Sequence, residues 1–167
     1  MKSILIFFSR ANENYAVGNL KVDNTEVLAK RIKKLINCDL FKCEPVKEYS
    51  SNYKECVKEA LFNKQNNLRP KLKQYLNNVD EYDYIILTGP IYFGEYPYEI
   101  YSLLDNLNLE NKIIMPLVTH EGSGLGNIIK ILKSKYPLAI IKDGLAIKGH
   151  EVNQSNIDDI LLNWLKF

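Results

Sequence analysis

Residues 113–126 read Ile-Ile-Met-Pro-Leu-Val-Thr-His-Glu-Gly-Ser-Gly-Leu-Gly, an apolar run that passes into a loop with glycine at alternate positions. The run has the length and composition of a buried strand, and the residues after it have helical spacing. The apolar positions of that helix are Leu125, Ile128, Ile129 and Leu132. A strand, a loop and a helix in succession are typical of α/β proteins with a parallel sheet. Alternate glycines also predict that the loop backbone approaches another group closely.

The same alternation extends in both directions from this stretch. Four further apolar runs predict strands: Ile4–Phe8, the neighbours of Leu40, Tyr84–Thr88 and Leu145–Ile147. Segments between the runs have amphipathic helical spacing, and we also expect helices over 52–66 and after Pro70. Asp143-Gly144 is expected to form a tight hairpin before the last strand. Five strands alternating with helices, with no linker or repeat, predict one α/β domain over residues 1–167.

Composition excludes several classes of protein. The 167 residues include 22 basic and 20 acidic side chains, a net charge of +2, which argues against a dedicated nucleic-acid binder. Arg10 interrupts the first apolar run, and no run approaches the ~20 residues of a membrane span, so we expect a cytoplasmic protein without a membrane partner. Three cysteines without a C-x-x-C pair, and two histidines outside zinc-ligand spacing, predict neither a disulfide framework nor a metal site.

The loops after the first, third and fourth strands are the candidate binding loops, because ligands of open parallel sheets bind where the strand order reverses. The first loop, residues 9–24, is long and enters a helix at Thr25, whose free N–H groups would suit a phosphate. Its neutral hydrogen-bonding side chains are Ser9, Asn12, Asn14, Tyr15, Asn24 and Thr25. Alternatively, Asp23 caps the helix, with Glu26 three residues later, and no ligand is needed.

The second and third loops have aromatic and glycine-rich compositions. Tyr92 and Phe93 follow a buried strand and offer a flat apolar wall for a planar ligand, although one of the two is expected to pack inward. The third loop, 119–126, does not match G-x-G-x-x-G, because Asn127 stands at the third glycine. His120 suits ligand contact and helix capping equally well.

Together these loops resemble those of the flavodoxin family, in particular bacterial flavodoxin-like proteins with an enlarged phosphate loop. The motifs that carry the resemblance are Phe8-Ser9-Arg10, Asn24-Thr25, Pro90-Ile91-Tyr92-Phe93-Gly94 and residues 119–126. The resemblance implies a three-layer sandwich with a five-stranded parallel sheet of order 2-1-3-4-5 and FMN at the switch point.

The resemblance also implies which residues contact FMN, and it implies no catalytic side chain. Residues expected in the phosphate loop are Ser9, Arg10, Ala11, Asn14, Tyr15, Asn24 and Thr25. Those expected around the isoalloxazine ring are Pro90, Ile91, Tyr92, Phe93, Gly94, Thr119, His120, Glu121 and Gly122. Ala11 departs from a related pattern, Ser-Arg-Thr-Gly, and removes one hydroxyl donor.

The implied function is that of a low-potential single-electron carrier whose redox partner proteins dock at the flavin edge. Two alternatives stay open: an FMN-dependent NAD(P)H:quinone-type oxidoreductase, and an interaction module, with or without bound flavin, that kept the fold.

Charge is unevenly distributed along the chain. Residues 74–111 contain seven acidic side chains and no basic one, and this acidic block includes the presumed flavin loop. Acidic groups around the flavin would steer a cationic partner and lower the flavin potential. The alternative is a solvated face whose charges are balanced by lysines close in space.

Overall fold

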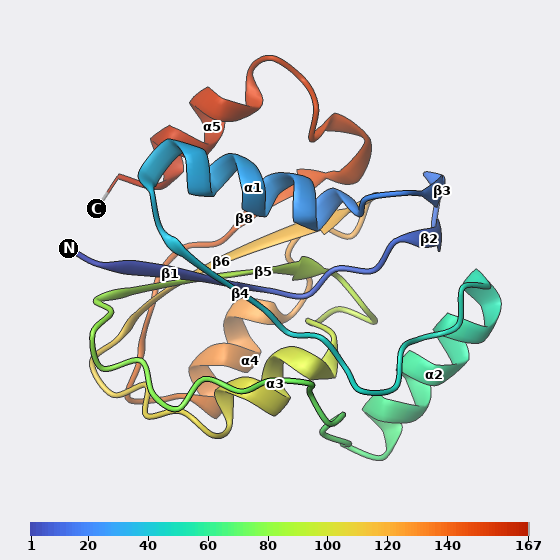
Figure 1. Ribbon diagram of the computed structural model, residues 1–167, viewed down its shortest axis with the longest axis horizontal. Coiled ribbons are helices and arrows are strands. Elements are labelled where there is room, and N and C mark those ends of the chain that lie inside the picture. The colour runs from blue at the N-terminus through green and yellow to red at the C-terminus, as the bar shows by residue number, and fades with distance from the viewer. Residues whose placement is uncertain (167) are drawn as a thin grey trace.

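A parallel β-sheet runs through the middle of the molecule, and helices cover both of its faces (Figure 1). The computed structural model describes residues 1–166. Its strands are β1 Ser3–Phe7, β2 Asn12–Asn14, β3 Gly18–Leu20, β4 Asp39–Lys42, β5 Tyr84–Pro90, β6 Ile113–His120, β7 Ile140–Ile141 and β8 Leu145–Lys148. Its helices are α1 Asn24–Ile36, α2 Tyr53–Gln65, α3 Tyr98–Leu104, α4 Ile128–Lys135, the short 3-10 helix η1 Gly149–Glu151 and α5 Ile157–Trp164.

The main sheet has the order β4-β1-β5-β6, and both β7 and β8 pair with the outer edge of β6. All of these pairings are parallel. Counted by position in the sheet, this is the predicted order 2-1-3-4-5, so the flavodoxin-like α/β sandwich is confirmed. The order reverses beside β1, because the chain returns from the edge strand β4 to β5 on the other side of β1.

The expected hairpin at Asp143-Gly144 is wrong, because β7 and β8 run in the same direction. Ile114 pairs with Ile141 and Leu117 with Leu145. An advance of three residues along β6 therefore corresponds to four residues along the β7–β8 segment. The extra residue is a bulge that interrupts a single edge strand. Gly144 lies close to α4 and the loop before it, and a Cβ atom there would lie 2.7 Å from a methyl carbon of Leu125, whose side chain would have to shift.

Two hydrophobic cores lie on opposite faces of the sheet, since successive strand residues point to opposite sides. Ile4 and Ile6 of β1 face the core that α3 and α4 cover, whereas Leu5 faces the core of α1 and α5. Figure 1 shows the two helix pairs on either side of the sheet. Leu28 and Ile32, one helical turn apart on α1, are fully buried, as the helical spacing indicates.

The segment between β4 and β5 contains one helix rather than two. The expected helix over 52–66 is present as α2. The second expected helix, after Pro70, is wrong, since all of residues 70–80 are described and contain no helical turn. Leu72 instead forms an antiparallel bridge with Pro45 and is buried, which ties this segment to the chain that leaves β4.

The long first loop is not irregular. Its strands β2 and β3 form an antiparallel hairpin, whose turn contains Ala16 with a φ of 61°. The hairpin extends beyond the main sheet toward α2 (Figure 1). None of the helices within residues 1–166 combines the length and the apolar character needed to cross a membrane.

Candidate functional site

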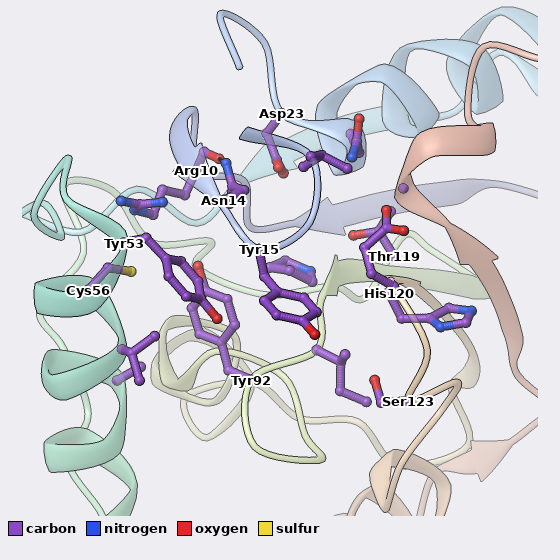
Figure 2. Close-up of a pocket in the computed structure, with 18 of the residues that line it drawn as sticks. Arg10, Asn14, Tyr15, Asp23, Tyr53, Cys56, Tyr92, Thr119, His120 and Ser123 are labelled. Carbon is purple, nitrogen blue, oxygen red and sulfur yellow. Dashed lines mark hydrogen bonds between the residues drawn. The ribbon is translucent and has the colours of Figure 1, made fainter. Parts of the chain in front are cut away.

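A cavity of about 420 Å³ lies at the carboxyl ends of β1, β5 and β6, beside the point where the strand order reverses (Figure 2). Its volume is within the range of small-molecule sites. All three predicted loops contribute to its wall, and α2 provides the remaining side. The residues that line it are Arg10, Asn14, Tyr15, Val17, Asp23, Asn24, Tyr53, Cys56, Val57, Ala60, Pro90, Ile91, Tyr92, Phe93, Thr119, His120, Glu121, Gly122, Ser123 and Gly149.

Arg10 connects the first loop to the chain before α2. Its guanidinium donates to the carbonyl oxygens of Glu13 and Ser50, while its Nε is buried and has no hydrogen-bond partner within residues 1–166. Glu13 adds a second connection, because its Oε2 accepts a hydrogen bond from the N–H of Tyr53 at 2.8 Å. The β2–β3 hairpin is therefore fixed against the first turn of α2.

The start of α1 forms the next part of the wall. Asp23 is the N-cap, and its Oδ2 accepts from the N–H of Thr25 at 3.2 Å, as the capping interpretation predicts. Burial raises the pKa of the Asp23 carboxyl to about 6, against the opposing effect of hydrogen bonds from Thr25, Arg10 and Asn24. Glu26 does not complete a capping box. Its carboxylate pairs with Lys30 and Lys42.

The second loop turns sharply at Tyr92-Phe93-Gly94-Glu95. Phe93 and Gly94 both have left-handed backbones, with φ values of 53° and 84°, and the loop closes through Tyr92 N–H to Glu95 O at 2.7 Å. Tyr92 packs edge-on against Phe8 and Tyr49, whereas Phe93 is 43% exposed. One aromatic thus points inward and the other outward, as the sequence predicts.

Lys64 of α2 holds this turn from the outside. Its Nζ donates to the carbonyl oxygen of Phe93 at 2.7 Å and lies 3.4 Å from the carboxylate of Glu95. The carbonyl of the Phe93-Gly94 peptide is therefore directed toward α2.

The third loop is organised by the side chain of His120. Its Nδ1 accepts hydrogen bonds from the N–H groups of Gly122 at 2.9 Å and Gly124 at 3.1 Å. An Nδ1 that accepts carries no proton, so the neutral ring has its proton on Nε2. His120 lines the cavity and does not cap α4, which has no side-chain cap among the described residues.

Glu121 links the third loop to η1. Its Oε1 accepts from the N–H of His150 at 2.9 Å, and its Oε2 lies 2.6 Å from Nδ1 of the same histidine. The side chains of Glu121 and Asn24 crowd Gly149 so closely that a Cβ atom there would lie 2.6 Å or less from each. A larger residue at position 149 would require the side-chain ends of Asn24 and Glu121 to shift.

Gly126 brings the second and third loops into contact. A Cβ atom on Gly126 would lie 2.6 Å from the carbonyl oxygen of Gly94, and Gly126 also has a left-handed φ of 53°. The same carbonyl accepts from the N–H of Asn127 at 2.7 Å. The alternate glycines thus allow a close backbone approach between two loops of the protein.

Most of the predicted cofactor residues line the cavity, and four do not. Ser9 turns away and donates to Oε2 of Glu26 at 3.2 Å. Thr25 is buried below the helix terminus, where its hydroxyl bonds that of Thr119. Ala11 and Gly94 lie beside the cavity without lining it. The assignment of any of these residues to a cofactor stays a prediction.

Four lining residues on α2 were not predicted: Tyr53, Cys56, Val57 and Ala60. The ring of Tyr53 lies near that of Tyr15, with centroids 6.1 Å apart at an angle of 32°. Cys56, Val57 and Ala60 are small, and burial raises the pKa of the Cys56 thiol. The sequence predicts a helix over 52–66 but does not indicate which of its faces meets the binding loops.

The acidic block does not surround the cavity. Asp80, Glu81 and Asp83 precede β5, and Glu110 precedes β6, so they lie at the amino ends of these strands, whereas the cavity is at the carboxyl ends. Lys2 contacts Glu81 through its Nζ and donates its backbone N–H to Asp83 at 3.0 Å. The expected acidic surface at the flavin edge is therefore wrong for these residues.

The other three acidic residues of the block are also neutralised or buried. Glu95 pairs with Lys64, and Asp105 pairs with Arg69 at 2.6 Å. Glu99 is 1% exposed and accepts from the hydroxyl of Tyr49 at 3.2 Å. The seven residues are close in sequence but do not form one acidic surface, and three of them, Glu81, Glu95 and Asp105, pair with basic residues.

Comparisons with known proteins agree with this architecture. A family model described as flavodoxin matches residues 20–166. A structure from Bacteroides uniformis ATCC 8492, proposed to be a flavoprotein, is 19% identical, with 96% of this chain and 97% of that chain covered and a TM-score of 0.78. No curated protein shows significant sequence similarity to the chain.

Two further structures carry functional descriptions. A Lactobacillus acidophilus NCFM flavoprotein in complex with FMN is 17% identical, with 92% of this chain and 97% of that chain covered and a TM-score of 0.64. An NADPH-quinone reductase from P. pentosaceus is 14% identical, with 98% and 95% covered and a TM-score of 0.56. At these identities the likeness shows the fold alone. No cluster of metal-ligating side chains occurs within residues 1–166.

Proposed function

The chain belongs to the flavodoxin family, and on that premise we propose that it binds one FMN without covalent attachment and carries single electrons between redox partner proteins. The observation that carries the proposal is the cavity of about 420 Å³ between the loops that follow β1, β5 and β6. This position is where open α/β sheets bind their ligands. The FMN complex of the L. acidophilus flavoprotein, on the same fold, supports the same cofactor.

The residues around the cavity fit FMN chemically. Tyr92 offers an aromatic ring for stacking, and Ile91 adds apolar surface beside it. Arg10 brings a buried guanidinium whose Nε has no partner within the described chain, a group suited to a phosphate oxygen. When bound, FMN would supply the electron-accepting chemistry, and the protein would position it and set its electrostatic surroundings.

The charges that line the cavity favour a low potential. Asp23 and Glu121 are acidic, and Arg10 is the basic residue of the lining. Each ionised carboxylate beside a flavin repels an added electron and favours the oxidised cofactor, so Glu121 lowers the potential, and Asp23 adds to this where it stays ionised with FMN bound. The acidic residues of segment 74–111 do not contribute to this effect as a group, because most of them lie away from the cavity.

Access to the cavity favours a carrier. Tyr15 and Phe93 border it and are 65% and 43% exposed, so a partner protein could dock against a flavin edge at this position. The cavity has room for about one ligand of cofactor size, which leaves little internal space for a second substrate. The three cysteines, all buried and free, suit the reducing conditions of a cytoplasm.

The second candidate is an FMN-dependent NAD(P)H:quinone-type oxidoreductase. The observation that favours it is the shared fold of the NADPH-quinone reductase from P. pentosaceus. Such an enzyme must accept hydride directly from the nicotinamide, whereas a carrier receives electrons from a protein donor.

Anaerobic reduction of the FMN-loaded protein distinguishes the two candidates. We expect gradual photochemical reduction to proceed in two one-electron steps, and NADPH or NADH alone to reduce the protein only very slowly. A fast two-electron reduction by either nucleotide, together with turnover of a quinone, would contradict the carrier proposal and support the oxidoreductase. A protein that takes up no FMN would contradict both.

A further inference from the structure

The carboxylate of Asp23 lies at the amino terminus of α1, where the helix presents free N–H groups. Its Oδ2 accepts from the N–H of Thr25 at 3.2 Å, and the backbone N–H groups of Arg10 and Asn24 also hydrogen-bond this carboxylate. Figure 2 shows the side chain pointing into the cavity. Asp23 thus occupies a position where a helix terminus would otherwise receive an external anion.

Asp23 is unusual among the acidic residues near the cavity because it has no charged partner. It is 6% exposed, and no basic nitrogen within residues 1–166 lies within 4 Å of its carboxylate. By contrast, Glu121 pairs with His150, and Glu26 of α1 pairs with Lys30 and Lys42. Hydrogen bonds from neutral groups, and no cation, compensate the Asp23 charge within the described residues.

Arg10 provides a second, independent sign of an anion site in the same cavity. It is 7% exposed, and two of its nitrogens donate to the carbonyl oxygens of Glu13 and Ser50. Its Nε is buried and without a partner in the described chain. A buried guanidinium with a free donor favours binding of a phosphate oxygen, whereas a carboxylate in the same cavity repels the phosphate.

We propose that Asp23 determines how the site treats the phosphate of its flavin: its carboxylate competes with that phosphate for the N–H groups at the start of α1. The inference rests on the proposed FMN binding. Phosphate entry requires Asp23 either to take up a proton or to turn away and give up its cap. FMN binding therefore strengthens when Asp23 is neutral, and riboflavin, which lacks the phosphate, is indifferent to it.

The surroundings of Asp23 favour its protonation in the mildly acidic range. Burial raises the pKa of the Asp23 carboxyl to about 6. The ionisable groups that face the cavity from other elements are Arg10 after β1, Tyr15 between β2 and β3, Tyr53 and Cys56 of α2, Tyr92 after β5, His120 at the end of β6 and Glu121 after it, with His150 of η1 behind Glu121. Burial raises the pKa of Tyr92 far above its usual value, so this phenol stays neutral throughout the range.

The test compares FMN and riboflavin binding to flavin-free wild type, Asp23→Asn and Asp23→Ser. Both replacements are good N-caps, so they remove the charge and keep the helix start. Asp80→Asn removes one charge at the opposite end of the sheet and is the matched control. Dissociation constants are measured by flavin fluorescence at pH 5 and pH 8, and thermal unfolding checks that each variant folds.

At pH 8 we expect Asp23→Asn to bind FMN at least about tenfold more tightly than wild type, because a phosphate no longer meets a buried carboxylate. At pH 5 the ratio of the wild-type to the Asp23→Asn dissociation constant for FMN falls toward one. The ligand phosphate itself titrates at about pH 6 and carries more charge at pH 8, so its titration and that of Asp23 both raise the ratio of the two dissociation constants at the higher pH. Riboflavin affinity stays within about twofold of wild type throughout.

An FMN ratio near one at pH 8 would overturn the inference while leaving FMN binding intact. An equal gain for riboflavin, or the same gain in Asp80→Asn, would also overturn it, because neither involves a phosphate beside residue 23. If no variant bound either flavin, both the proposed function and this inference would be overturned together.

Discussion

The hydroxyl oxygens of Thr25 and Thr119 lie 2.9 Å apart in the buried space between the first turn of α1 and the end of β6. The resemblance assigns these residues to opposite parts of the cofactor, one to the phosphate and one to the ring. The structure joins them directly, so they brace two walls of the cavity. A brace of this kind positions the loops before any ligand arrives.

Loss of one hydroxyl from this pair should destabilise the protein. Thr25→Val leaves the hydroxyl of Thr119 buried without its partner, and we expect the free energy of unfolding in urea to fall by about 1–3 kcal/mol. Thr88→Val is the matched control, because the hydroxyl of Thr88 is buried and already has no partner within residues 1–166. That variant should be as stable as wild type. Equal losses in both variants would contradict the brace.

Gly126 and Gly124 separate crowding from backbone strain. Both have left-handed φ values, 53° and 62°, but a Cβ atom on Gly126 would meet Gly94 O at 2.6 Å, whereas nothing lies within 4 Å at Gly124. We expect Gly124→Ala to cost about 1 kcal/mol of unfolding free energy, from φ alone, and Gly126→Ala clearly more. FMN affinity should fall mainly in Gly126→Ala, since the loop of Gly94 must shift. Matching losses in the two variants would rule out the close contact.

The aromatic ring of Tyr92 should contribute directly to flavin binding. Tyr92→Leu keeps apolar volume against Phe8 and Tyr49 but removes the stacking surface, so we expect the dissociation constant for FMN to rise about tenfold or more. Tyr92→Phe should bind as wild type does. The affinity for riboflavin should fall in parallel, whereas replacement of Asp23 should change the affinity for FMN alone. Unchanged affinity in Tyr92→Leu would exclude this ring as the flavin wall.

Glu99 should make stability depend on pH. Burial raises the pKa of its carboxyl to about 7 from an ordinary value of 4.5, so the folded state holds a proton that the unfolded state has lost. This contribution is fully present below pH 4.5 and disappears as pH rises through 7, by at most about 3 kcal/mol. Urea unfolding at pH 5 and pH 8 measures it. Glu99→Gln should reduce the decline, and an identical decline in that variant would contradict the assignment.

The apolar runs were sufficient to predict the strands, because residues such as Ile4–Phe7 and Ile113–Val118 are apolar over their whole length, whereas the strand order came from the family resemblance. It was not sufficient for the β2–β3 hairpin, whose strands Asn12–Asn14 and Gly18–Leu20 lack apolar alternation. The hairpin depends on bonds to Ser50 and Tyr53, which are far away in the chain. Long-range polar contacts of this kind leave no local pattern.

The site was predicted to the extent that it consists of loops after strands. The contribution of α2 was missed, because the position of this helix depends on how the chain returns from β4 to β5. That path decides whether Cys56 and Ala60 face the cavity. The prediction that residues 74–111 form an acidic surface around the flavin was wrong for a related reason. β5 spans about 20 Å from Tyr84 to Pro90, so Asp83 and Phe93 lie near opposite ends of the sheet although they are close in sequence.

The most direct test of the account is a calorimetric titration of flavin-free protein with FMN at pH 6. We expect saturation at one FMN per chain with a dissociation constant of about 1 μM or lower, and a weaker constant in Tyr92→Leu measured in parallel. An absence of saturable binding up to about 1 mM FMN, in a wild-type protein that unfolds cooperatively, would contradict the account.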